Sequence, residues 1–178
     1  MADAFLPQTI EDNVTFRKLI SGEINVITED MLEGLTEIRD YAFYRCDYLK
    51  IIGLPHSITK IGNYSFYNVG VGYMSSDFFD LKIPNGVTTI GEFAFQNAHI
   101  KSVVIPISTT NVGRMAFYLC SQLSSVTVDA TTPPTIGSGV FSNAHSSLVI
   151  YVPAASVETY KSAANWSQYA DKIQAIVE

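Results

Sequence analysis

A six-residue pattern of apolar and small residues recurs five times along the chain. An aliphatic residue is followed by glycine in four of the five copies, then by two variable residues, usually a small residue, and phenylalanine. The copies lie at 38–43, 61–66, 90–95, 112–117 and 136–141. Their phenylalanines are 23, 29, 22 and 24 positions apart. A period in this range indicates stacked supersecondary units rather than a domain with one central core.

A second pattern follows each phenylalanine and predicts a β-strand. Apolar residues alternate with one variable residue, which is the period of a half-buried strand. Proline follows in four copies, and it ends a strand because it has no N–H to give to the ladder. The copies lie at 49–55, 78–84, 100–106, 123–129 and 148–153, with Asp129 in place of the proline.

The predicted strands give a count of six turns. The first buried aliphatic residues of these strands are Ile24, Ile52, Leu81, Val103, Val126 and Ile150. Alternation places the residues beside them on the outer face of the strand sheet. These outward residues are Ile51, Gly53, Asp80, Lys82, Ser102, Val104, Ser125, Thr127, Val149 and Tyr151.

Together the two patterns resemble the BspA-like leucine-rich-repeat family over roughly residues 32–153. The resemblance is specific because both patterns recur in the same order. It implies a repeat solenoid: a β-rich, right-handed coil of about six turns with short helical turns and helical terminal caps. It also implies binding to proteins or host surfaces, without catalytic residues. The chain departs from the family pattern at Arg39 and at Gly139-Val140, so we expect distorted first and last copies.

The segments outside the repeats predict two caps. Residues 1–36 are interpreted as an N-terminal cap with a short helix over 11–20, residues 37–153 as the repeats, and residues 154–178 as a helical C-terminal cap. Pro153 is suited to open the C-terminal helix. Such a cap covers core and strand edge that the last turn would otherwise expose. Its apolar residues are Val157, Tyr160, Trp166, Tyr169, Ile173 and Ile176, the last three at helical spacing.

Charge and chemistry narrow the function classes. The formal net charge of −6 and the lack of a basic stripe argue against a nucleic-acid partner. No apolar run is long enough to span a membrane, and residues 1–5 lack the features of a secretory signal. The histidines and carboxylates are dispersed, so we expect no metal, no cofactor and no enzymatic activity. Localisation is left open, and the family resemblance suggests a cell surface, secretion or a virion.

The two cysteines are predicted to be free. Cys46 and Cys120 each follow a pattern phenylalanine by three residues, a small apolar core position. They are three turns apart, or roughly 14 Å at the usual strand spacing. A disulfide needs Cα atoms within about 7 Å of each other, so the repeat excludes a bridge between them.

Three surfaces are candidates for binding. Tyrosines that follow the pattern phenylalanines predict a ridge of Tyr44, Tyr67 and Tyr118, although these rings could also be packing residues. The 29-residue interval between Phe66 and Phe95 is longer than the others and contains an insertion within 69–79. This insertion is expected to form a looped-out tip that exposes Tyr73, Met74 and Phe79. The strand face centred on Ser102 and Ser125, with Tyr151 at its end, is the third candidate.

These features favour a non-enzymatic interaction module that acts in adhesion or surface binding. The alternative is a structural component of a phage or prophage particle, in which the repeats space other subunits. In both cases the identity of the partner is open.

Overall fold

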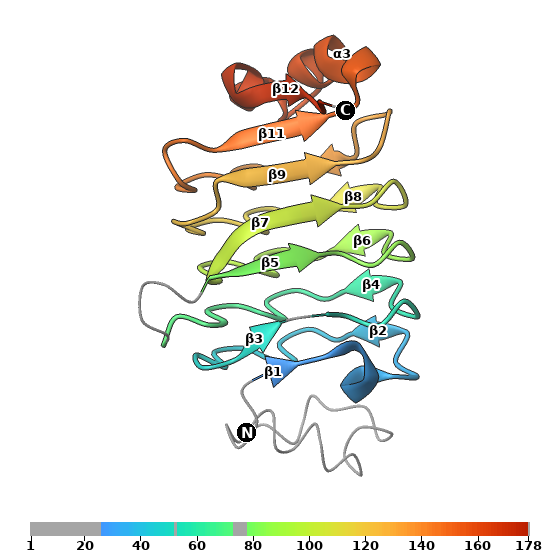
Figure 1. Cartoon of the computed structure of the whole chain (residues 1–178), viewed down its shortest axis with the longest axis vertical. Coiled ribbons are helices and arrows are strands. Elements are labelled where there is room, and N and C mark those ends of the chain that lie inside the picture. The colour runs from blue at the N-terminus through green and yellow to red at the C-terminus, as the bar shows by residue number, and fades with distance from the viewer. Residues whose placement is uncertain (1–25, 52, 73–77, 178) are drawn as a thin grey trace.

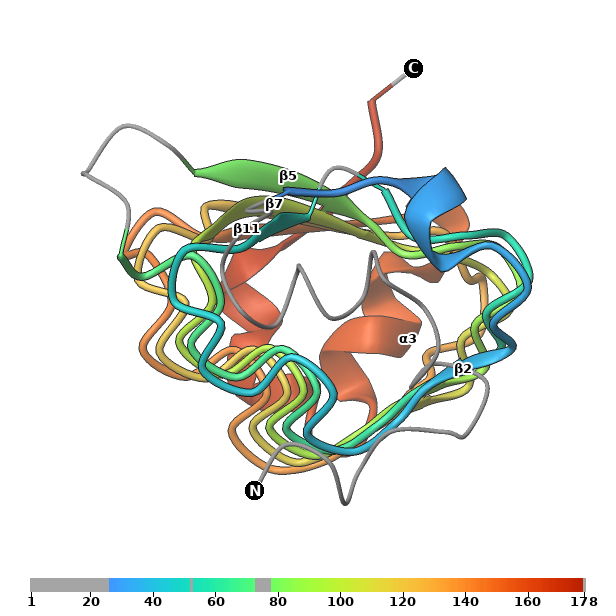
Figure 2. The ribbon, with the colours of Figure 1, turned by 90° about the horizontal axis from the view of Figure 1, so that it is seen from below.

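The computed structural model describes residues 26–51, 53–72 and 78–177. Within this part, the chain passes through turns that stack along its longest axis (Figure 1). Seen along that axis, the turns lie nearly one over another (Figure 2). Two sides of the stack are parallel sheets, and the third consists of tight turns. The predicted β-rich repeat architecture is confirmed, whereas the hand of the coil stays a prediction.

Among the described residues, the strands form two larger sheets and one small one, and all their pairs are parallel. The long-strand sheet contains β5 (Phe79–Lys82), β7 (Ile100–Ile105), β9 (Ser125–Val128), β11 (Val149–Val152) and β12 (Ile173–Ala175). The short-strand sheet contains β2 (Glu37–Ile38), β4 (Lys60–Ile61), β6 (Thr89–Ile90), β8 (Asn111–Val112) and β10 (Thr135–Ile136). The remaining pair, β1 (Val26–Ile27) and β3 (Lys50–Ile51), lies below β5 in Figure 1.

The strand registers test the predicted inward residues. From β5 to β11 the prediction is confirmed, because the buried residues Leu81, Val103, Val126 and Ile150 lie in line across the long-strand sheet. At β3 it is wrong, because Ile51 is buried and pairs with Ile27. Positions 51 and 52 are both isoleucine, so alternation alone cannot decide which faces inward. Ile24 and Ile52, like the predicted helix over 11–20, lie outside the described residues.

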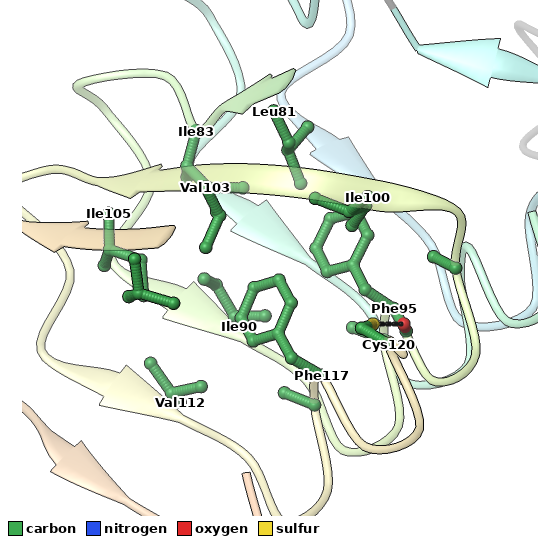
Figure 3. Packing of buried hydrophobic residues seen from close by; sticks show 14 of the residues in the cluster. Leu81, Ile83, Ile90, Phe95, Ile100, Val103, Ile105, Val112, Phe117 and Cys120 are labelled. Carbon is green, nitrogen blue, oxygen red and sulfur yellow. Dashed lines mark hydrogen bonds between the residues drawn. The ribbon is translucent and has the colours of Figure 1, made fainter. Parts of the chain in front are cut away.

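A ladder of phenylalanine rings runs through the interior. Successive ring centroids of Phe43, Phe66, Phe95, Phe117 and Phe141 are 5.1, 5.1, 5.2 and 5.8 Å apart, with interplanar angles of 17° or less. All five side chains are buried. In Figure 3, Phe95 and Phe117 lie among aliphatic side chains from both larger sheets, including Ile90 and Val103. The recurrent phenylalanine is therefore a core residue, as its register predicts.

The tight turns are hydrogen-bonded to one another like strands. In the first turn, the N–H groups of Tyr41, Phe43 and Arg45 donate to carbonyls of the second turn at 2.9, 2.7 and 2.8 Å. The corresponding N–H groups of the second turn donate to the third in the same way. Because these groups pair across turns, the irregular third side carries a continuous backbone ladder.

The repeated glycine allows this close stacking. A Cβ atom on Gly91 would lie 2.6 Å from the backbone nitrogen of Asn63 in the preceding turn, and one on Gly62 would lie 2.5 Å from that of Asp40. Any larger residue would push neighbouring turns apart. Arg39 occupies the same position in the first copy, which no other copy precedes, so glycine is not required there.

The expected distortion of the first and last copies is not found. Strand β2 keeps the register of its neighbours, pairing Glu37 with Lys60, and β10 pairs in register with β8. Gly139 has φ +66°, close to the +54° to +61° of its equivalents Tyr41, Tyr64, Phe93 and Met115. Glycine adopts this left-handed conformation without steric cost, so it fits the turn.

Short helices lie at both ends of the described stack. η1 (Glu29–Leu32) belongs to the first turn, and η2 (Ala154–Ser156), α3 (Val157–Ser162) and η3 (Ser167–Lys172) follow the last repeat. Trp166, Tyr160 and Tyr169 are buried there, whereas Val157 and Ile176 are half-buried. The prediction that Ile173 continues a helical face is wrong, since Ile173–Ala175 forms β12 and pairs with β11.

Side chains from the segment that follows β11 also satisfy backbone groups of the last repeat. The Trp166 indole N–H donates to the Pro134 carbonyl at 2.8 Å, and the Asn165 amide donates to the Ile136 carbonyl at 2.8 Å. The Phe141 N–H, which would otherwise point to a next turn, donates to the Tyr169 hydroxyl at 3.1 Å. Side chains therefore replace the partners that another repeat would supply.

The glycine stacking leads to a stability prediction. Gly91→Ala should lower the free energy of unfolding by about 1–3 kcal/mol or more, because its Cβ meets rigid backbone of the preceding turn. Arg39→Ala at the equivalent position should change it by under about 0.5 kcal/mol, since only an exposed ion pair to Glu37 is lost. Urea titration followed by circular dichroism measures both, and equal effects would contradict this role of glycine.

A second stability prediction concerns Ser65. Its hydroxyl oxygen is buried and has no hydrogen-bond partner among the described residues. The equivalent residues in the neighbouring turns are Ala42 and Ala94. Because an unpaired buried hydroxyl costs free energy, Ser65→Ala should stabilise the fold by about 1 kcal/mol. A lower midpoint of urea unfolding in the variant would show that the hydroxyl is paired in solution.

Candidate interaction surface

The described residues offer no metal centre. They contain no group of three or more His, Cys, Asp or Glu side chains placed to hold a metal ion. Within the same part of the chain, no helix has the length and apolar character needed to cross a membrane.

One hollow of about 580 Å³ lies between η1 and the 55–57 turn. It brings together serine, histidine and carboxylate side chains, with His56 Nε2 3.8 Å from Glu29 Oε2. The Ser57 hydroxyl does not complete a catalytic arrangement, because it donates to the Leu35 carbonyl at 2.6 Å. The His56 side chain is also 78 % exposed, which leaves it in solvent rather than in a site that excludes water.

The most distinctive surface is a group of stacked aromatic rings on the tight turns. We call Tyr41, Tyr44, Tyr64, Tyr67 and Phe93 the aromatic ladder. Its first column holds Tyr41, Tyr64 and Phe93, whose successive ring centroids are 5.0 and 4.7 Å apart with interplanar angles of 4° and 15°. Its second column holds Tyr44 and Tyr67, stacked at 4.9 Å.

The two columns contact each other and remain accessible. Tyr41 and Tyr44 meet edge to face at 5.7 Å, and Tyr64 and Tyr67 meet at 6.0 Å. Tyr41 is 42 % and Tyr44 43 % exposed, while Tyr64 and Tyr67 are half-buried. The columns therefore form one continuous aromatic surface beside the buried phenylalanines.

A charged group covers the last ring of the first column. The Arg114 guanidinium carbon lies 4.7 Å from the centre of the Phe93 ring, within cation–π range. The same guanidinium is 3.7 Å from the Glu92 carboxylate. The surface thus combines tyrosine and arginine, two residue types that are enriched among interface hot spots.

The hydroxyls of the aromatic ladder differ from the buried Tyr160 hydroxyl in their hydrogen bonding. The hydroxyls of Tyr44, Tyr64 and Tyr67 make no hydrogen bond to another described residue, whereas Tyr160 donates to the Ala130 carbonyl at 2.7 Å. Desolvation among neighbouring rings raises the pKa of Tyr64 above its usual value. This hydroxyl therefore remains protonated and able to donate at neutral pH.

The first column is held in an unfavourable backbone conformation. Tyr41, Tyr64 and Phe93 have φ of 61°, 54° and 55°, a left-handed region that bulky residues seldom adopt. The cost is of order 1–2 kcal/mol per residue, and ring stacking returns about 0.5–1.5 kcal/mol per pair. Gly139 has the conformation without that cost. Met115 has φ of 55° at the same position, so the conformation belongs to the turn of every copy, whatever residue occupies it.

The predicted tyrosine ridge is present only in part. Tyr44 and Tyr67 stack as neighbours. Tyr118 has no ring contact with another described aromatic residue, because Gln96 occupies the equivalent position in the intervening turn. Each residue of the first column lies two positions before a pattern phenylalanine and has a left-handed φ.

The predicted insertion surface is wrong at Phe79. This residue is buried, begins β5 and pairs with Ile100 of β7. Phe79 lies two residues before Leu81 on the same buried face of β5, so it belongs to the strand pattern at 78–84 and not to the insertion. Tyr73 and Met74 lie outside the described residues.

The predicted strand face exists as a separate surface on the long-strand sheet. Ser102 and Ser125 are paired neighbours, and Tyr151 pairs with Thr127. The Ser102 hydroxyl donates to the Asp80 carboxylate at 2.5 Å. Ser102, Ser125 and Tyr151 are all half-buried in this small polar face. They lie on a different side of the stack from the tight turns (Figure 2).

Both cysteines are free, and their surroundings suppress thiolate formation. Burial raises the pKa of Cys46 to about 11, with a smaller contribution from the charge of Asp47. Burial raises the pKa of Cys120 to about 12. The Cys120 thiol lies 3.1 Å from the Phe95 carbonyl oxygen, the contact dashed in Figure 3.

Comparison with known proteins identifies the repeats. The family model for the BspA type leucine rich repeat region matches in six copies, over residues 22–75 and 36–170. No curated protein matches the chain significantly.

The surroundings of the two thiols predict that both cysteines react slowly with alkylating reagents. At pH 8 both groups are almost entirely protonated, and only the thiolate is nucleophilic. We expect iodoacetamide to label neither cysteine within minutes in the native protein, and Cys46 to react before the fully buried Cys120 on long exposure. Mass spectrometry of the labelled protein, with urea-unfolded protein as control, measures this. A Cys46–Cys120 disulfide in unreduced protein would contradict the stacking order.

Proposed function

Because the chain belongs to the BspA-type leucine-rich-repeat family, we propose that it is a non-enzymatic protein-interaction module that acts in adhesion or surface binding. The proposed contact surface is the aromatic ladder with Arg114. The observation that carries the proposal is that five aromatic side chains stack into one accessible surface.

The composition of the ladder supports a protein partner. Tyrosine gives large contact area and a hydrogen-bonding group while freezing only two side-chain torsions. Stacking fixes Tyr44 and Tyr67 against their neighbours before any partner binds, which lowers the entropy cost of association. A solenoid that fills its interior with its own side chains favours extended outer surfaces over deep pockets for recognition.

The same surface would also serve a phage or prophage particle, in which it would attach a neighbouring subunit. The regular ring spacing of about 5 Å in both columns of the ladder is compatible with adhesion and with attachment of a particle subunit. Neighbouring genes for tail or baseplate proteins would favour the particle, and capture by intact host cells would favour adhesion.

A capture experiment tests the proposed surface. The full chain is immobilised and exposed to solubilised host surface proteins and, separately, to particle proteins. Replacing Tyr44 and Tyr67 together by serine should weaken capture of a specific protein by about 10–100-fold, because both are placed as hot spots. Tyr151→Ser on the long-strand sheet is the matched control and should bind as the unchanged chain does.

Two further measurements make the result decisive. Circular dichroism melting should show that the double variant remains folded. If it is folded and binds normally, while Ser102→Arg together with Ser125→Arg abolishes capture, the contact surface is the long-strand sheet and the ladder assignment is wrong.

A further inference from the structure

We propose that Asn85 is a site of spontaneous deamidation, at which the native protein acquires aspartate and isoaspartate in place of asparagine. This inference is independent of the proposed function, because the turn between β5 and β6 that carries Asn85 is not part of the aromatic ladder (Figure 1). Three features support it: an exposed side-chain amide, a following N–H that no described carbonyl accepts, and a glycine that leaves that nitrogen uncovered.

The reaction needs only the chain and water. The backbone nitrogen of Gly86 attacks the side-chain carbonyl carbon Cγ of Asn85, so an N–Cγ bond forms and the Cγ–Nδ2 bond breaks. The side-chain nitrogen leaves as ammonia and takes up the proton that the Gly86 nitrogen loses. Water then opens the five-membered succinimide ring at either carbonyl, which gives aspartate or isoaspartate.

The turn leaves both reacting groups available. The Val87 N–H donates to the Pro84 carbonyl at 3.0 Å, so Asn85 and Gly86 are the two central residues of a β-turn. Asn85 is exposed, and neither its side-chain amide nor the Gly86 N–H is hydrogen-bonded to another described residue. Glycine also places no side chain beside the attacking nitrogen and lets the backbone rotate towards the amide.

The other described asparagines lack this combination. After five of them, the N–H of the next residue donates to a backbone carbonyl at 2.9–3.3 Å. These donors are Tyr64, Val69, Ala98, Ala144 and Trp166. The sixth, Asn111, is exposed, but the next residue is the β-branched Val112 of β8, a strand that is paired on both sides. Among the described asparagines, Asn85 is therefore the one at which ring closure is least hindered.

The neighbouring repeats indicate a matched replacement for Gly86. Serine stands at the equivalent position in the preceding and following turns, and the Ser57 and Ser108 hydroxyls donate to carbonyls of the turn before them at 2.6 and 2.9 Å. A Cβ on Gly86 would lie 3.0 Å from the Ile58 carbonyl oxygen. Gly86→Ser therefore needs a small adjustment that the same stack accommodates in both neighbouring turns.

Isoaspartate would lengthen the turn where it is closely stacked, because the main chain then passes through Cβ and gains one atom. Directly after the turn, the Thr88 N–H donates to the Thr59 carbonyl at 2.9 Å, and the Val87 carbonyl accepts from the Thr109 hydroxyl at 2.9 Å. The modified chain is expected to carry an additional negative charge, so anion exchange separates it, and to unfold at a lower urea concentration than the unmodified chain.

The test incubates the full chain at 37 °C in phosphate buffer at neutral pH and about one pH unit higher, and locates modified residues by tandem mass spectrometry. We expect Asn85 to gain about 1 Da with release of ammonia, and faster at the higher pH because the attacking nitrogen must lose its proton. An isoaspartate-specific carboxyl methyltransferase identifies isoaspartate. Gly86→Ser, which covers the nitrogen, and Asn85→Gln, which would need a six-membered ring, should each slow the change at least about tenfold.

Two comparisons in the unchanged chain keep the result decisive even where a variant does not fold. The exposed Asn111 of β8 is expected to react at least tenfold more slowly than Asn85, and the urea-unfolded chain is expected to react at Asn85 at a rate within about tenfold of the native rate. The inference is overturned if native Asn85 reacts no faster than Asn111 or more than tenfold more slowly than in the unfolded chain. Equal rates in folded Gly86→Ser and the unchanged chain would overturn it as well.

Discussion

The rest of the structure depends on the short distance between successive turns. Backbone hydrogen bonds of 2.7–3.1 Å between equivalent tight turns set that distance, and the phenylalanine rings from Phe43 to Phe117 stack at 5.1–5.2 Å. Strand spacing in a parallel sheet is nearly the same, about 4.8 Å. One repeat therefore serves backbone pairing and ring stacking at once. It also requires glycine wherever a Cβ would meet the turn beneath, as at Gly62 and Gly91.

The short distance between successive turns also brings equivalent residues of neighbouring turns into contact at the surface. A side chain that points outward in one turn lies about 5 Å from its equivalent in the next, so similar residues form columns without any long-range design. Inside the stack this produces the phenylalanine ladder, and outside it produces the Tyr41, Tyr64 and Phe93 column. A partner that contacts such a column meets a preformed row rather than separate flexible side chains, which lowers the ordering cost of binding.

Features that follow from the repeat period could be predicted from the sequence. The side on which a single residue lies within its own strand or turn could not always be predicted. The regular spacing of Phe66, Phe95 and Phe117 and the strands β5 to β11 follow from the repeat. The prediction for Ile51 was wrong because its neighbour is equally apolar. The prediction for Phe79 was wrong because the residue was assigned to the insertion within 69–79, which overlaps the strand pattern at 78–84. The outward rings of the first column follow from positive φ angles, which residue types alone do not reveal when the residue is tyrosine. The strand at Ile173 was mistaken for a helix because apolar residues at 169, 173 and 176 fit helical spacing.

Substitutions in the two columns of the aromatic ladder are expected to affect stability to different degrees. Tyr64 lies between Tyr41 and Phe93 in a left-handed conformation, so replacing it alters stacking, backbone strain and surface together. Tyr44 and Tyr67 do not have positive φ, and their rings form the outer column. Their hydroxyls can be removed without changing the stacked rings. The second column is therefore where a binding role can be separated from a folding role, whereas a loss of binding on changing Tyr64 alone would leave the two roles mixed.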